Sequence, residues 1–563
     1  MSIWHGVSRL RVTGVAGAII ILTSTTTGCS NDPGRTTPAS IGATAATNFN
    51  SQSYENVREG GTLRVPGQPI EQGNPFHADA NLPADRMWFW YNAAAITYSP
   101  TGDAQYNPDY FSDVKVEFGG GNQKVTIRIN PNATFNDGTP IDYHAIEATW
   151  RANSGSNSGF FSGDVILYSR ITSVRSGKDA KEAVIDFDGV NPAWSALFTT
   201  FLHPKAAADA ASFNTAYLSK VQPEWGTGPY VVTTYDARTG DATFERNPKW
   251  WGKKGRLDKR IAVGLTHQAS INAFRNGELD YVVSGSSDQL RQISDVPGTE
   301  IRKGGSPFQY ALFLNSKAPI LSDLAVRKAV LESVNRSQLA SISLQGLDYQ
   351  EPLPGSLVYY PFQRGYEDNV SEVIKFNPEG AKKDLDASGW RLGSDGVREK
   401  DGKRLELGYT IFGDDPLQKA MLGALTKQLE PIGVKVEARP SSEADYETVI
   451  RGRQFDIFFL GNRSLDPFGA RYLDSFYGST NKQNISGVGT PELDSKIEAA
   501  VEIAELDAQV AMANEVEREG LALYGVAPIY SGPSIYGVTK ELANIGATIF
   551  GTPLPETIGW QKP

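Results

Sequence analysis

The sequence is poor in the residues that bind metals and carry redox chemistry. Its 563 residues include one cysteine, Cys29, and five histidines. A single cysteine excludes an intramolecular disulfide, a cysteine-based zinc site and a CxxC redox pair. No two histidines stand four residues apart, which excludes the two-histidine zinc motif of a helix. The sequence therefore predicts no metal site, and we expect no cofactor.

Catalytic motifs are missing as well. GxGxxG, Walker A, HExxH and GxSxG do not occur. Residues 112–115 fit SxxK, but the SDN and KTG motifs that accompany it in penicillin-recognising enzymes are absent. An acid–base pair among the 64 acidic residues stays open, since sequence alone does not reveal one. We predict that the chain is not an enzyme, and we assign no catalytic residue.

Charge and length narrow the class of protein further. The 54 basic and 64 acidic residues give a net charge of −10, which argues against binding to nucleic acid or to anionic lipid headgroups. Hydrophobic residues make up 40% of the chain and charged residues 21%, which excludes a polytopic membrane protein. Single hydrophobic cores stop growing at about 250–300 residues. The chain therefore contains several lobes.

The N-terminal residues have the pattern of an export signal. Residues 1–28 contain Arg9 and Arg11 and no acidic residue, and the apolar run 12–22 is too short to span a bilayer. The alternative is an N-terminal helix of the folded part. Thr26-Thr27-Gly28-Cys29 resembles a bacterial lipobox, although leucine is usual where Thr26 stands. A lipobox implies cleavage before Cys29 and a diacylglycerol on its thiol, with residues 29–57 as a flexible tether.

The rest of the sequence alternates between strand and helix patterns. We predict strands at 61–66, 125–129, 183–187, 226–235, 405–411, 434–437 and 455–460. The run at 455–460 is almost entirely apolar, as in a strand buried on both faces. We predict helices at 143–151, 324–334, 378–388 and 416–429, and two helices within 491–523 that break near residues 506–507. This alternation indicates an α/β architecture.

Seven segments in order along the chain carry a family resemblance. They are F-N-D-G-T-P at 135–140, G-T-G-P-Y at 226–230, R-N-P-K-W-W-G at 246–252, A-F-R-N-G-E-L-D at 273–280, one segment in two parts at 314–319 and 323–329, F-N-P-E-G-A-K-K-D-L at 376–385 and S-G-W at 388–390. Together they resemble the family 5 extracellular solute-binding proteins, the receptors of ATP-driven peptide importers. The tandem Trp250-Trp251, the lipobox-like start and residues 393–403 resemble actinobacterial oligopeptide-binding lipoproteins in particular.

The resemblance implies an α/β fold of the periplasmic-binding-protein type, in which two lobes flank a cleft and a further subdomain is inserted (the large peptide-binding subclass). Lobe I is expected at 58–98, 224–312 and 528–563, the inserted subdomain II at 99–223 and lobe III at 313–527. We expect Arg327, within one of the family segments, to be an ion-paired surface residue.

The resemblance also implies a function. A substrate-binding lipoprotein of this family captures oligopeptides in the cleft by hinge closure and delivers them to the permease and ATPase subunits of an ABC importer. It is expected to be an exported monomer, anchored by Cys29 to the outer face of the cytoplasmic membrane. Two alternatives stay open: the same fold binding a non-peptide or anionic small ligand, and a regulatory or scaffold lipoprotein without transport function. A cell-wall enzyme is a fourth reading that no motif supports.

Candidate binding residues follow from the family's cleft. Relatives place an aspartate beyond the buried lobe III strand, where it pairs with the peptide ammonium. Here either Leu465 or Asp466 takes that position. Arg463 is a candidate clamp for a carboxylate or phosphate, with a solvent-facing or internally paired arginine as the alternative.

Further candidates lie on the opposite wall and near the hinge. Asn81 and Leu82 belong to the lobe I loop that relatives place against the ligand. Phe308 and Tyr310 begin a strand near the hinge and either line the cleft or pack in the core.

Overall fold

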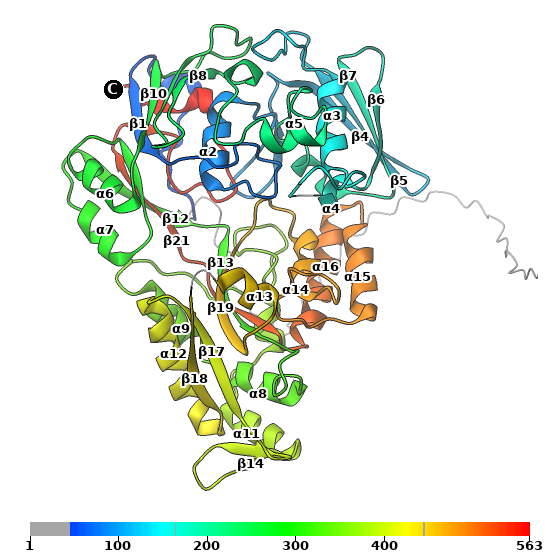
Figure 1. Ribbon diagram of the computed structural model, residues 1–563, viewed down its shortest axis with the longest axis vertical. Coiled ribbons are helices and arrows are strands. Elements are labelled where there is room, and N and C mark those ends of the chain that lie inside the picture. Colours follow the sequence, from blue (N-terminus) through cyan, green and yellow to red (C-terminus); the bar gives the residue numbers. More distant parts are fainter. Residues whose placement is uncertain (1–45, 164, 443–444) are drawn as a thin grey trace, which may run out of the picture. The chain divides into compact units, whose positions relative to one another are not determined.

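The computed structural model of the protein describes residues 46–163, 165–442 and 445–563, in which helices and strands alternate (Figure 1). The signal predicted at 1–28, Cys29 and the tether up to residue 45 lie outside the described residues. The end of the expected tether is packed on the fold. Asn48 N donates to the Ala547 carbonyl at 2.8 Å, and Val57 is fully buried. The packed chain therefore starts before the expected boundary at residue 58, since Ala46 also joins a buried cluster with Phe550.

Two four-stranded sheets hold many of the strands in the first half of the chain. One has the order β1-β10-β9-β8, and the other has the order β4-β5-β7-β6. The predicted strands at 61–66 and 226–235 are the two edges of the first sheet, and the predicted helix at 143–151 packs on β6 and β7 as α3. The elements are β1 (Thr62–Gly67), β8 (Tyr230–Tyr235), β9 (Ala242–Arg246), β10 (Lys259–Gly264), β4 (Phe111–Gly119), β5 (Asn122–Ile129), β6 (Ile171–Ser176), β7 (Glu182–Phe187) and α3 (Tyr143–Asn153).

A five-stranded sheet forms the core of the second half of the chain. Its order is β18-β17-β19-β13-β20. The strands are β13 (Phe308–Leu314), β17 (Glu406–Phe412), β18 (Lys435–Ser441), β19 (Ile457–Arg463) and β20 (Val526–Tyr530). β19 is the strand predicted from the apolar run at 455–460, and Ile457, Phe458 and Phe459 are buried. The prediction is confirmed because β19 takes an interior position in the sheet.

The helices of this half begin where capping residues predict. α8 (Leu324–Ser333), α11 (Pro378–Ala387) and α12 (Pro416–Leu429) each follow an Asp or Asn whose side chain accepts a hydrogen bond from the first turn. The region 491–523 forms α15 (Pro491–Val501) and α16 (Leu506–Leu521), so the predicted break is confirmed. Figure 1 shows α12 and α9 (Arg336–Leu344) beside the strands of the sheet, in agreement with their contacts to β18 and β20.

A smaller sheet is connected to the five-stranded sheet twice. It has the order β11-β21-β12, with β11 (Tyr281–Ser284), β12 (Thr299–Gly305) and β21 (Pro533–Thr539). The chain passes from β12 to β13 and returns from β20 to β21. At the second connection the Glu351 carboxylate accepts hydrogen bonds from Ser531 N at 2.7 Å and Gly532 N at 3.0 Å. Gly532 has φ of +78°, which a glycine adopts without strain.

The expectation for Arg327 was wrong. Arg327 is only 7% exposed, and its guanidinium donates to backbone carbonyls at the ends of neighbouring segments. Nη1 donates to the Leu321 carbonyl at 2.7 Å, and Nε donates to the Leu523 carbonyl at 3.0 Å. The arginine donates hydrogen bonds to carbonyl groups that have no backbone partner at the end of a helix or turn.

A buried carboxylate holds the segment that carries two cavity-lining residues, Leu357 and Tyr360. Glu517 on α16 is fully buried and accepts from Ser356 Oγ at 2.6 Å, Leu357 N at 2.6 Å and Asn369 Nδ2 at 2.7 Å. Burial raises the pKa of Glu517, and these hydrogen bonds oppose that shift.

Replacing this carboxylate leaves its donors without an acceptor. We expect Glu517→Ala to lower the free energy of unfolding by about 3 kcal/mol, because several buried donors lose their partner at about 1–3 kcal/mol each. Urea unfolding followed by circular dichroism measures this difference. Glu515→Ala, an exposed position on the same helix, is the control and should change stability by less than about 0.5 kcal/mol. Equal effects of the two variants would contradict the assignment.

Candidate functional site

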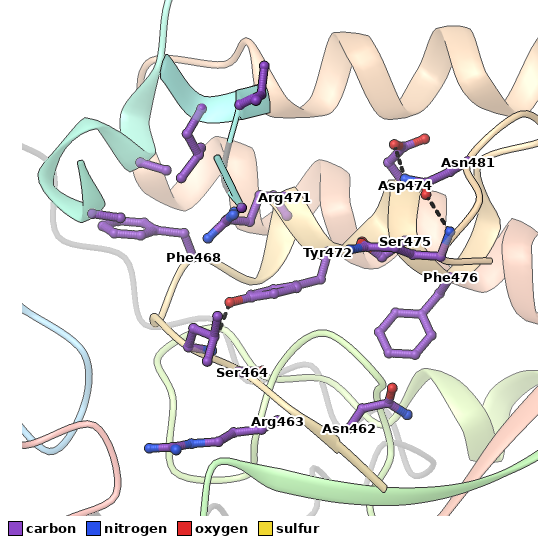
Figure 2. Close-up of a pocket in the computed structure, with 18 of the residues that line it drawn as sticks. Asn462, Arg463, Ser464, Phe468, Arg471, Tyr472, Asp474, Ser475, Phe476 and Asn481 are labelled. Atoms are coloured by element: carbon purple, nitrogen blue, oxygen red, sulfur yellow. Dashed lines mark hydrogen bonds between the residues drawn. The ribbon is translucent and has the colours of Figure 1, made fainter. Parts of the chain in front are cut away.

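A cavity of about 1220 Å³ lies beside the end of β19. Its walls come from distant parts of the sequence: the loop before α2 (Leu82–Tyr91), parts of residues 163–200, and several segments of the second half of the chain. Figure 2 shows part of the wall, where Asn462, Arg463 and Ser464 lie at the end of the strand and residues from Phe468 to Asn481 lie beyond them. The volume is sufficient for a ligand larger than a typical drug-sized molecule.

At the end of β19, backbone N–H and C=O groups that bond to the neighbouring strand alternate along the chain with groups that do not. Antiparallel pairing with β13 sets Asn462 opposite Gln309. Ser464 N donates to the Pro307 carbonyl at 2.9 Å. Because bonded and non-bonded pairs alternate in an antiparallel ladder, Asn462 bonds to β13 and Ser464 bonds to Pro307, the residue before β13. The N–H and C=O groups of Arg463, which lies between them, point away from β13.

On its other side, β19 loses its strand neighbour before it ends. Within the described residues, β17 pairs with β19 at a single position, Tyr409 with Ile457. The same alternation directs the backbone groups of Gly461 and Arg463 toward this unpaired side. Arg463 lines the cavity. The end of β19 is therefore an open strand edge at the cavity wall.

Leu465 and Asp466, the alternative candidates for the amine anchor, are neighbours in different surroundings. Asp466 is 5% exposed, forms an ion pair with Arg471 through Oδ2, and accepts from Phe468 N at 2.9 Å through Oδ1. Leu465 is 77% exposed and lines the cavity. The Asp466 carboxylate thus has a cationic partner within the protein. Leu465, the one of the two that lines the cavity, is apolar.

Arg463 presents an exposed side chain to the cavity. In the part of the chain that the structure describes, its guanidinium has no ion pair and no hydrogen bond. Figure 2 shows the side chain extending away from the strand. An arginine free in a cavity is able to bind a carboxylate, a phosphate or a carbonyl oxygen of a ligand.

Sequence reasoning missed Asp85, which lies on the first turn of α2 and lines the cavity. The surrounding protein raises the pKa of Asp85 to about 6, and the nearby Arg463 guanidinium opposes this shift. The side chain is still exposed to cavity water, which weakens the effect relative to full burial. An acidic residue in the first turn of a helix is common for reasons of helix stability, so the sequence contained no signal that singled it out.

The structure brings together four of the seven predicted binding residues. Asn81, Leu82, Arg463 and Leu465 line the cavity, while Asp466, Phe308 and Tyr310 do not. Tyr310 stacks on Tyr530 with ring centroids 4.5 Å apart, and the Phe308 ring lies 5.0 Å from Tyr310.

Metal sites and membrane-spanning helices are both absent from the described residues. The described residues contain no group of three or more His, Cys, Asp or Glu side chains placed to hold a metal ion. Among the same residues, no helix combines the length and the apolar character needed to cross a bilayer.

Comparisons with known proteins cover most of the chain. The family model described as bacterial extracellular solute-binding proteins, family 5 Middle, matches residues 119–484. The oligopeptide-binding protein OppA of Mycobacterium tuberculosis (strain ATCC 25618 / H37Rv) is 31% identical over 524 residues, which span 91% of this chain and 86% of that protein.

Solved structures show the same fold. The periplasmic EDTA-binding protein EppA matches with a TM-score of 0.83 at 22% identity, over 92% of this chain and 99% of that one. The oligopeptide-binding protein AppA from Bacillus subtilis, solved in complex with a nonapeptide, matches with a TM-score of 0.70 at 17% identity, over 90% and 100% of the two chains. The fold class predicted from the sequence is confirmed.

The raised pKa of Asp85 gives a prediction for stability against pH. With a pKa of about 6 in the folded protein and about 3.9 in the unfolded chain, the folded state binds this proton more tightly. Wild-type stability therefore falls relative to Asp85→Asn as the pH rises from 4 to 7. Melting temperatures of both proteins at each pH measure this, and the advantage of Asp85→Asn should grow across the window. A constant difference would contradict the shift.

Proposed function

Because the chain belongs to the bacterial extracellular solute-binding proteins of family 5, we propose that it is the substrate-binding component of an ABC importer and that its substrates are oligopeptides. In this proposal, lobe I (58–98, 224–312 and 528–563), subdomain II (99–223) and lobe III (313–527) close around a peptide in the cavity. The closed monomer then docks on the permease, and the ATPase subunits drive uptake. The protein binds and releases its substrate without chemical change.

The open edge of β19 is the observation that carries the peptide proposal. An extended peptide adds to a free strand edge through main-chain hydrogen bonds, which every peptide offers whatever its sequence. Arg463 combines a cavity position with backbone groups that point away from β13. Exposed Leu82 and Leu465 line the same cavity and offer apolar contacts to peptide side chains without a demand for one sequence.

The unpaired Arg463 supports a second candidate, a small anionic ligand. Its guanidinium would bind a carboxylate or phosphate through two parallel hydrogen bonds. This candidate keeps the fold and the importer role and changes the substrate class.

Native mass spectrometry of the purified protein distinguishes these functions. After incubation with a pooled library of short peptides, the peptide proposal predicts a ladder of bound peptide masses. A single non-peptide mass retained from the expression host would favour the anionic ligand. A protein that stays free of ligand in both conditions would contradict transport and favour a regulatory or scaffold role.

A proline substitution separates the backbone of Arg463 from its side chain. We expect Arg463→Pro to bind peptides about two- to tenfold more weakly than Arg463→Ala, because only the proline variant loses the N–H that faces the ligand, and one hydrogen bond contributes about 0.5–1.5 kcal/mol. Isothermal titration calorimetry with a library-selected peptide measures both affinities.

The proline should leave the fold intact. The Arg463 N–H is not part of the β13 ladder, and proline is tolerated where a strand has no partner on that side. Circular dichroism and the melting temperature check this for each variant. Equal affinities of Arg463→Pro and Arg463→Ala would contradict a backbone hydrogen bond at this position.

Anchoring by lipid is part of the same proposal. The protein is exported and held by diacylglycerol on Cys29 at the outer face of the cytoplasmic membrane, so that captured peptides stay near the permease. We expect wild type to enter the detergent phase of a Triton X-114 partition and Cys29→Ala to stay in the aqueous phase. The alanine variant has no thiol to receive the diacylglycerol and therefore lacks the acyl chains that give membrane affinity. Wild type in the aqueous phase would contradict lipidation.

A further inference from the structure

An ion pair at the rim of the cavity joins two parts of the chain that are distant in sequence. Arg170 Nη2 lies 2.6 Å from Glu502 Oε1, across 332 positions. Arg170 lines the cavity, as does Val501, the residue before Glu502. The two side chains are 31% and 52% exposed, so solvent reaches the pair. Figure 1 shows α4 (Val165–Tyr168), which ends two residues before Arg170, beside α15 and α16.

The segment that follows β7 positions Arg170. Asp188 N donates to the Arg170 carbonyl at 2.8 Å, and Arg170 Nε donates to the Asp188 carbonyl at 3.4 Å. The next residue, Gly189, has φ of +72°, and a Cβ at this position would lie 2.7 Å from Arg170 Nη2. A side chain at position 189 would therefore displace the guanidinium, and glycine leaves its path to Glu502 free.

The helix that precedes Glu502 gains nothing from an acid at this position. Glu502 is the C-cap of α15, and residues 498–501, its last turn, contain no basic residue. The backbone carbonyls give a helix C-terminus a partial negative charge, so an acidic side chain there is unfavourable to the helix. The ion pair with Arg170 offsets this unfavourable interaction. Glu502 thus stabilises a contact between distant segments rather than its own helix.

A second contact between the same two regions of the chain is apolar. A Cβ added to Gly102 would lie 2.3 Å from Pro467 Cβ, and Phe468 packs on the buried cluster that includes Phe111. Separating apolar surfaces in water is costly, whereas the members of an exposed ion pair are hydrated at little net cost when they separate. Of the two contacts, the ion pair is therefore the one suited to open and close.

We propose that the Arg170–Glu502 ion pair is a latch that holds the rim of the cavity closed and slows the release of a bound ligand. The inference rests on the proposed peptide function and deepens it, since it gives the proposed subdomain II, which contains Arg170, a part in retaining the ligand against lobe III.

The strength of the pair suits this role. Exposed ion pairs are weak because water competes for both charges, so the latch slows release without trapping the ligand. Salt screens charges that are exposed to solvent. Release of the ligand should therefore become faster as the ionic strength rises.

The test reverses one charge of the latch and restores the pair with a second reversal. The variants are Glu502→Arg, Arg170→Glu and the two combined, and Glu519→Arg is the matched control. Glu519 on α16 pairs with Lys496 on α15 at 2.5 Å with comparable exposure, and neither residue lines the described cavity. Each protein is loaded with a fluorescein-labelled peptide selected from the pooled library. A stopped-flow chase with excess unlabelled peptide measures the dissociation rate.

Each single reversal should release the peptide about three- to tenfold faster than wild type, because attraction across the rim becomes repulsion between like charges. The combined variant should return to within about twofold of wild type, and Glu519→Arg should match wild type. Glu502→Arg places a cation at the C-terminus of α15, which favours the helix, so its melting temperature should not fall. This result separates a latch from a structural ion pair, whose loss lowers stability.

Unchanged release from Glu502→Arg would overturn the inference while peptide binding stands. Fast release that the combined variant does not restore would overturn it as well. If wild type binds no peptide, the proposed function is contradicted, and small-angle X-ray scattering of the ligand-free proteins then decides about the latch. A larger radius of gyration for Glu502→Arg than for wild type and Glu519→Arg would support the latch, and equal values would overturn it.

Discussion

β19 has a strand neighbour on both sides where it begins and on one side where it ends, and the proposed ligand site depends on that difference. The paired beginning is fixed by β13 and by the contact of Tyr409 with Ile457. The unpaired end leaves backbone groups of Gly461 and Arg463 without a strand partner in the described structure. Buried backbone groups without partners are costly, so this edge is stable only where water or a ligand reaches it.

The charged side chains around this edge differ in whether the protein itself supplies a partner for them. A charge held inside a protein needs a partner, and removing one member of a buried pair costs about 3–5 kcal/mol. The chain satisfies Asp466 with Arg471 and surrounds Glu517 with donors. Among the residues that the structure describes, Asp85 and Arg463 have no such partner at the cavity surface. The wall of the cavity therefore carries an open strand edge beside charged side chains that the described protein does not pair.

Much of the fold was predictable because its signals are local. The apolar run at 455–460 predicted β19, and Asp or Asn before α8, α11 and α12 marked their first turns. The candidate site was predictable in part: Arg463, the last residue of that strand, and Leu465, two residues beyond it, both line the cavity.

The remaining features depend on contacts that the sequence does not reveal. Asp466 turns inward to Arg471 because of the turn that follows β19. A shift of one residue in the sequence comparison exchanges this buried carboxylate for the exposed Leu465. Asp85 resembles any acid in the first turn of a helix. Arg327 is buried because carbonyl groups from a distant helix end, at Leu523, converge on it.

Amide hydrogen exchange at the end of β19 tests the central claim most directly. NMR spectra of the selectively labelled protein, with and without a bound peptide, resolve Gly461, Asn462 and Arg463. If peptides bind as an added strand, the amides of Gly461 and Arg463 become protected on binding, while that of Asn462, already bonded to β13, changes little. Unchanged exchange at Gly461 and Arg463 in a protein saturated with peptide would contradict the account.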